Sequence, residues 1–228
     1  MIPFYSFLAF VPLLLLADRS AYVDGQPDTR YYVILFGGQS GLLKPTTGHI
    51  WATYVRETRC PAKTHRLEEF TISWLPVTGR VRPAAVRPEP GINHTLDGTM
   101  QILCGPRSRI GLWGPYEISE CRFNQAIQQK ALLESGAVLY KLLDGRTHGE
   151  VAYHCLHAIT AGHPDVHERC RVVLGWGEKA AALAASAMLS TGMISDPDAT
   201  HEWLLPALGL DPQRFVRRMP ADRIIDRR

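Results

Sequence analysis

The stretch HIWATYVRE, residues 49–57, follows the period of two that places successive side chains on opposite faces of a β-strand. The residues that share a face with His49 are Trp51, Thr53 and Val55. A second stretch, EEFTISWLP at residues 68–76, alternates in the same way. The linker between the two stretches is short enough for antiparallel neighbours. They therefore predict the centre of an antiparallel sheet.

Other segments extend this sheet. RYYVILFGG at 30–38 is a short apolar run that ends in two glycines and predicts a buried strand. We expect further strands in TMQILCG, RIGLWGPYEI and AVLYKLLD, at residues 99–105, 109–118 and 137–144. Residues 76–98 are rich in proline and glycine and predict an extended excursion without regular structure.

The second half of the chain is predicted to be mainly helical. Residues 119–136 combine a capping serine, Ser119, with an apolar stripe at helical spacing and a final glycine. The alanine-rich segment 178–192 predicts a second helix, and shorter ones are expected at 155–162 and 200–210. Strands followed by helices indicate an α+β fold, with an antiparallel sheet packed on helices.

The chain of 228 residues predicts one globular domain at residues 22–210 with a segment on either side. Residues 2–17 carry no charge and have the length of a secretory apolar region, so 1–21 is expected to be an export signal or a short membrane anchor. The location predicted from this is exported or membrane-associated. Residues 211–228 are rich in arginine and are expected to form a flexible tail.

The formal net charge of +3 is close to balance and indicates no nucleic-acid partner. We also expect no cofactor. We expect the binding partner to be a small-molecule, peptide or lipid substrate. Residues 2–17 are the segment that would anchor the chain to a membrane.

The segment around Cys155 reads AYHCLHAITAGH at residues 152–163. In a helix, the neighbouring histidines would point away from the apolar face, so a base for Cys155 would have to come from another element. The helix start is open between two positions. If a capping box at Thr147 begins the helix, Cys155 lies two turns from its N-terminus. If the helix begins near His154, Cys155 lies at its positive end, where the pKa of a thiol is lowered. We favour the later start.

His49 at the mouth of a strand, followed about a hundred residues later by the Cys155 helix, resembles the circularly permuted papain-like proteins. These are relatives of the NlpC/P60 superfamily that include the lecithin retinol acyltransferase-like group. Their cysteine motif reads Asn-Cys-x-His-Phe, and here the cysteine and the later histidine match in His154-Cys155-Leu156-His157-Ala158. The chain also resembles a bacterial exported family with TISWLP and WGPYE landmarks, which implies no activity.

The papain-like resemblance implies a cysteine-dependent hydrolase or acyltransferase that acts on an amide or ester bond, with cell-envelope material as a candidate substrate. Cys155 would attack the carbonyl and His49 would accept and return the proton. A third polar group would orient His49. The candidates for that group are Glu69, Thr71, Ser73 and His65.

Two other functions compete with thiol chemistry. In one, Cys155 is a buried structural residue of a non-enzymatic exported domain, as free cysteines often are. In the other, the chain binds a metal ion through a histidine and cysteine cluster. The ligands for such a site would come from His154, His157, His163, His167 and Cys170.

Overall fold

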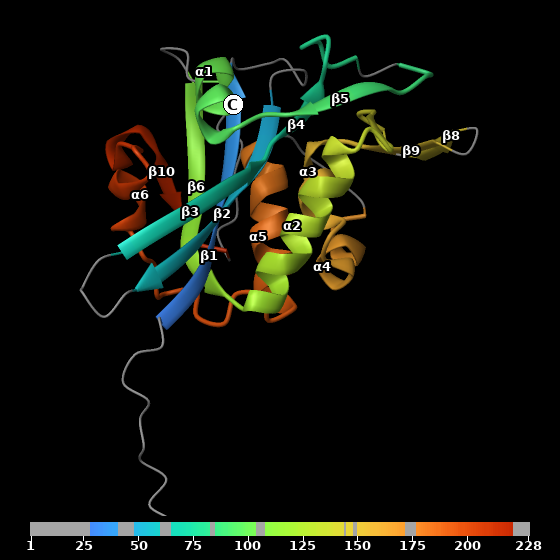
Figure 1. The fold of residues 1–228 in the computed structure, drawn as a ribbon. Coiled ribbons are helices and arrows are strands. Elements are labelled where there is room, and N and C mark those ends of the chain that lie inside the picture. The colour runs from blue at the N-terminus through green and yellow to red at the C-terminus, as the bar shows by residue number, and fades with distance from the viewer. Residues whose placement is uncertain are drawn as a thin grey trace, which may run out of the picture.

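The computed structural model describes residues 28–40, 48–59, 65–82, 85–103, 108–143, 145–147, 150–171 and 177–220 (Figure 1). Its strands form mostly antiparallel sheets that pack against helices, so the predicted α+β class is confirmed. The proposed export signal at 1–21 lies outside the described residues. Among the residues that are described, no helix is both long enough and apolar enough to cross a membrane.

The larger sheet has the strand order β10-β6-β1-β2-β3 within the described residues. Its strands are β1 (Asp28–Ser40), β2 (Gly48–Arg59), β3 (His65–Ile72), β6 (Ser108–Ile118) and β10 (Val216–Arg218). The central pair β1–β2 is antiparallel, with Phe36 opposite Trp51. These strands were expected from their alternating or continuous apolar patterns, apart from β10.

The chain leaves this sheet at Ser73 and enters a second, smaller one with the order β4-β5-β7-β9-β8. Its strands are β4 (Trp74–Pro76), β5 (Glu89–Asn93), β7 (Val138–Tyr140), β8 (Gly145–Thr147) and β9 (Glu150–Tyr153). The stretch predicted as one strand at 68–76 is therefore split between the two sheets.

Helices cover the larger sheet on both faces, as Figure 1 shows. The main core lies between the sheet and one set of helices: α2 (Glu120–Glu134), α3 (Cys155–Thr160), α4 (Pro164–Arg169) and α5 (Glu178–Ser190). The small core lies on the opposite face, under α1 (Leu96–Leu103), α6 (Leu204–Ala207) and the 3-10 turn η2 (Pro212–Arg214). Ile50 and Ala52 of β2 face the main core, and Trp51 and Val55 face the small core.

Three local predictions were wrong. The segment 76–98, predicted to lack regular structure, contains β5 (Glu89–Asn93) and the start of α1. The segment predicted as a strand at 99–105 lies partly in α1, because Leu96 and Leu103 pack into the small core at helical spacing. The flexible tail predicted at 211–228 does not hold for residues 211–220, where β10 pairs in parallel with β6. The indole of Trp113 also donates a hydrogen bond to the carbonyl of Met219. Residues 221–228 lie outside the described part.

Gly37 sets how closely α5 approaches the sheet, and we expect Gly37→Ala to lower the free energy of unfolding by about 2–3 kcal/mol. An added Cβ would lie 2.8 Å from both the Gly177 carbonyl oxygen and the Glu178 Cα. These are main-chain atoms, so the whole helix would have to move. Urea denaturation measures the effect. In the matched variant Gly38→Ala, the Cβ would meet only the Trp51 ring at 3.2 Å, and a similar loss there would contradict this explanation.

Candidate functional site

Cys155 is the first residue of α3. The preceding strand β9 ends at Tyr153, and His154 caps the helix by accepting the Leu156 N–H on Nδ1 at 3.2 Å. Thr147 belongs to strand β8, so the alternative start at a Thr147 capping box is wrong. The favoured later start is confirmed, and the side chain of Cys155 lies beside the unpaired N–H groups of the first helical turn.

The start of α3 meets β2 beside His49. Pairing between β2 and β3 stops at Ala52 and Ile72, so the edge of β2 at Ile50 lies beyond the end of β3. The main-chain N–H of Ile50 interacts there with the Cys155 thiol. The fold therefore brings the thiol to the residue that follows His49, although the two side chains are about a hundred residues apart in the sequence.

The electrostatic environment of the thiol combines two opposed effects. Burial raises the pKa of Cys155, and the main-chain N–H groups of Ile50, Leu156 and Cys155 itself lower it without cancelling the rise. Cys155 is therefore a thiol at neutral pH in this conformation, and a nucleophilic role requires a base.

His49 is buried, and its ring lies on the small-core side of β2, stacked on Trp51 with ring centroids 5.7 Å apart. Its Nε2 lies 2.9 Å from the Ser73 hydroxyl, and Ser73 lies 2.7 Å from the hydroxyl of Thr99 in α1. The Thr99 hydroxyl has a single proton, which it can donate to Ser73 or to the Thr95 carbonyl at 2.8 Å. The direction of the hydrogen bond between Ser73 and His49 Nε2 depends on the tautomer of the imidazole.

With Nε2 donating to Ser73 the lone pair of His49 lies on Nδ1, and with Nε2 accepting from Ser73 the proton lies on Nδ1. That atom is buried and has no hydrogen-bond partner among the described residues. Burial, with a smaller contribution from His94, lowers the pKa of His49 to about 3. The imidazole is thus neutral at physiological pH. The junction that holds Ser73 is fixed by Asn93, whose Oδ1 accepts the Ser73 N–H at 2.7 Å.

The side chains of His49 and Cys155 lie on opposite faces of β2. Cys155 packs against the main core, whereas the His49 ring lies with Trp51 on the small-core side. No hydrogen bond joins them in the described structure. The backbones of the two residues are close together, but their side chains lie on opposite faces of β2, so the His49 ring and the Cys155 thiol are separated.

The histidines nearest to Cys155 in sequence pack on one another. The rings of His154 and His157 are stacked with centroids 4.2 Å apart, and His167 lies 4.6 Å from His157. His157 Nε2 donates to the Cys170 carbonyl at 2.9 Å. His163 lies apart from this cluster and pairs through Nδ1 with Gln125 at 3.0 Å.

These positions bear on the metal hypothesis. Within the described ranges, no three histidine, cysteine or acidic side chains are arranged to hold a metal ion. His154 uses Nδ1 to cap α3, and Cys170 is a buried free thiol whose pKa burial raises to about 12. The structure brings His154, His157 and His167 together, but their ring nitrogens do not point toward a common position for a metal ion.

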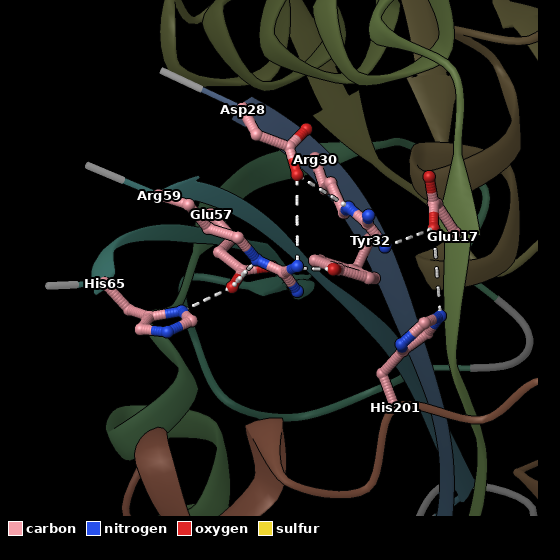
Figure 2. A network of polar contacts seen from close by, with 8 residues as sticks. All are labelled: Asp28, Arg30, Tyr32, Glu57, Arg59, His65, Glu117 and His201. Carbon is pink, nitrogen blue, oxygen red and sulfur yellow. Dashed lines mark hydrogen bonds and ion pairs between the residues drawn. The ribbon is translucent and has the colours of Figure 1, made fainter. Parts of the chain in front are cut away.

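A second polar cluster lies at the other end of β2 and was not predicted (Figure 2). The fully buried carboxylate of Glu57 accepts hydrogen bonds from the Tyr32 hydroxyl at 2.7 Å, from Arg59 at 2.7 Å and from His65 at 2.6 Å. Burial alone would raise the pKa of Glu57, but these hydrogen bonds outweigh it and hold the pKa at about 2. His65, a candidate to orient His49, is therefore committed to Glu57.

A signal for this cluster is present in the sequence. Glu57 lies on the same face of the strand as His49, Trp51, Thr53 and Val55, so the alternating pattern places a carboxylate on the buried face. A charge at such a position requires partners. Ser73 was one of several candidates, and only its position at the sheet junction selects it.

Comparisons of the chain with protein-family models, with curated proteins and with solved structures find no match.

Proposed function

We propose that this protein is a cysteine-dependent hydrolase or acyltransferase with Cys155 as nucleophile and His49 as base. The observation that carries the proposal is the meeting of the α3 start with β2, where Cys155 contacts the N–H that follows His49. Two further features support it. Ser73 and Thr99 hold the His49 ring, and its Nδ1 has no hydrogen-bond partner among the described residues. The proposal takes the tautomer in which Nε2–H donates to Ser73 and Nδ1 carries the lone pair.

In this mechanism His49 Nδ1 takes the thiol proton while Cys155 Sγ attacks the carbonyl carbon of an amide or ester. The N–H groups at the start of α3 stabilise the negative oxygen of the tetrahedral intermediate. The intermediate collapses to an acyl-thioester, and His49 returns the proton to the leaving amine or alcohol. Water then gives hydrolysis, or another nucleophile gives acyl transfer. Because the two side chains lie on opposite faces of β2, this step requires the start of β2 to rearrange so that Nδ1 reaches the thiol.

The class of substrate follows from the resemblance rather than from the geometry. A peptide, lipid or small molecule with an amide or ester bond fits the reaction, and an exported or membrane-associated enzyme would meet such bonds in cell-envelope material.

A second candidate function is a non-enzymatic exported domain in which Cys155 is structural. The observations that favour it are the raised pKa of the buried thiol and the separation of Cys155 from His49 by the plane of β2. The two candidates differ in whether His49 controls the reactivity of Cys155.

The test is the rate of Cys155 alkylation by iodoacetamide between pH 5 and 10, followed by mass spectrometry of its peptide. We expect His49→Ala to slow alkylation at pH 7 by about tenfold or more, because general-base assistance is lost. Ser73→Ala should slow it less, because it only releases the His49 ring. Exposed Cys121 in the same sample is the internal control and should not change.

A generic ester such as p-nitrophenyl acetate provides a second readout, and its turnover should be lost in both Cys155→Ser and His49→Ala. Identical alkylation profiles in wild type and His49→Ala, with no Cys155-dependent turnover, would refute the proposal and leave Cys155 structural.

A further inference from the structure

The chain between β4 and β5 projects from the body of the protein at the upper right of Figure 1. We call its described residues, 77–82 and 85–88, the arginine arm. Its base is held by a hydrogen bond from the Val77 N–H to the Pro90 carbonyl at 2.9 Å and by the packing of Val81 against the main core. The arm is therefore attached to the fold and exposes the side chains beyond its base.

Among the arginines whose side chains the structure describes, most of those without an acidic partner lie on the arm. Of the 14 arginines whose side chains the structure describes, nine lie within ion-pair distance of a carboxylate. The five described arginines without such a partner are Arg80, Arg82, Arg87, Arg169 and Arg214. Three of these five are on the arm. The neighbouring carboxylate of Glu89 accepts a hydrogen bond from Thr78 and does not pair with any of these three arginines, so the arm carries a net positive charge.

Exposed apolar side chains stand beside these cations. Val86 is 80% exposed and Val77 is 59% exposed, and Val86 is the most exposed of the large apolar residues that the structure describes. A soluble anion would satisfy the arginines but would leave both valines in water. A surface that presents negative charge above an apolar interior would accommodate both kinds of side chain.

We propose that the arginine arm docks the protein on an anionic lipid surface, with Arg80, Arg82 and Arg87 against the headgroups and Val86 inserted between them. This inference does not depend on the proposed thiol chemistry. The arm leaves and re-enters the fold at the end of the β4–β5 pair that lies away from Ser73 and Asn93.

The test is co-sedimentation of the full chain with vesicles of phosphatidylcholine, with and without 40% phosphatidylglycerol. The measured quantity is the ratio of the two partition coefficients, because an apolar leader would bind both kinds of vesicle. Each arginine near an anionic surface contributes about fivefold to binding, so R80Q/R87Q should lower the ratio by roughly 25-fold. The matched control R169Q/R214Q removes the same charge from unpaired arginines elsewhere and should leave the ratio within about twofold.

Two further measurements separate a lipid surface from a soluble anion. Raising the salt concentration from 50 to 300 mM should weaken wild-type binding, and Val86→Ser should weaken it several-fold at either concentration. A wild-type ratio near one, or an equal fall in the two double variants, would overturn the proposal. So would tight binding of inorganic polyphosphate that is indifferent to Val86→Ser, since it would assign the arm to a soluble polyanion.

Discussion

Glu57→Ala is expected to lower the free energy of unfolding by about 3–5 kcal/mol. The Glu57 carboxylate is fully buried and is the common acceptor for Tyr32, Arg59 and His65, which come from three adjacent strands. Removing it leaves the buried Tyr32 hydroxyl without its acceptor and leaves the Arg59 guanidinium with the longer ion pair to Asp28 at 3.9 Å. Breaking one side of a buried, hydrogen-bonded charge cluster costs much more than the cluster contributes when it is replaced as a whole.

Urea denaturation at pH 7 measures this loss, with Glu68→Ala as the matched control. Glu68 pairs with Arg56 on the neighbouring strand β2 and with Arg66 on its own strand β3, but its side chain is 37% exposed and its ion pairs are open to solvent. We expect the control to lose less than about 1 kcal/mol. Equal losses in the two variants would show that the hydrogen bonds to Glu57 do not stabilise the fold as described.

Acidification from pH 7 to pH 4.5 is expected to remove at least about 3 kcal/mol of stability. Burial lowers the pKa of His163 to about 4, with a smaller contribution from Arg122 that Asp165 partly opposes. Burial likewise lowers the pKa of His154 to about 4 and that of His49 to about 3. In the unfolded chain these groups titrate near 6.5, so between that pH and the folded pKa values the unfolded state binds more protons.

The stabilisation that comes from the neutral buried histidines is therefore complete above pH 6.5 and is lost as the pH falls toward 4. Glu69 has the opposite effect on the pH dependence of stability because burial raises its pKa. It is a single group, however, whereas the three histidines act together. Urea titrations at pH 7.0, 5.5 and 4.5 measure the slope. His163→Gln removes one titrating group and should reduce the difference between pH 7.0 and 4.5, and a stability that is flat over this interval would contradict the account.

The regular elements were predictable because their patterns are local. The alternation at 49–57 and the apolar run at 30–38 correspond to β2 and β1, and Ser119 caps α2 as expected. The strand predicted at 99–105 was wrong because a short apolar run fits a strand or a helix equally well, and packing under the small core decided for a helix. The pairing of residues 216–218 with β6 carries no local signal at all.

The candidate site was predictable only in part. His49 and Cys155 were identified from their residue types and their positions at element ends, and the structure brings their backbones together. The alternation of β2 also meant that His49 would share a face with Trp51 and not with Ile50, yet which face receives α3 depends on how the helix packs. That packing places the thiol on the other side of the strand.

By itself the sequence determined the four long strands β1, β2, β3 and β6, the main helices and the α+β class, because hydrophobic period and capping act over a few residues. It also placed a cysteine at one of two helix starts. Only the tertiary structure decided which start was used, that Ser73 rather than Glu69, Thr71 or His65 holds His49, and that Glu57 receives three partners. These choices depend on which strand ends and helix starts meet in space, and that is decided by burial of the whole core rather than by any local pattern.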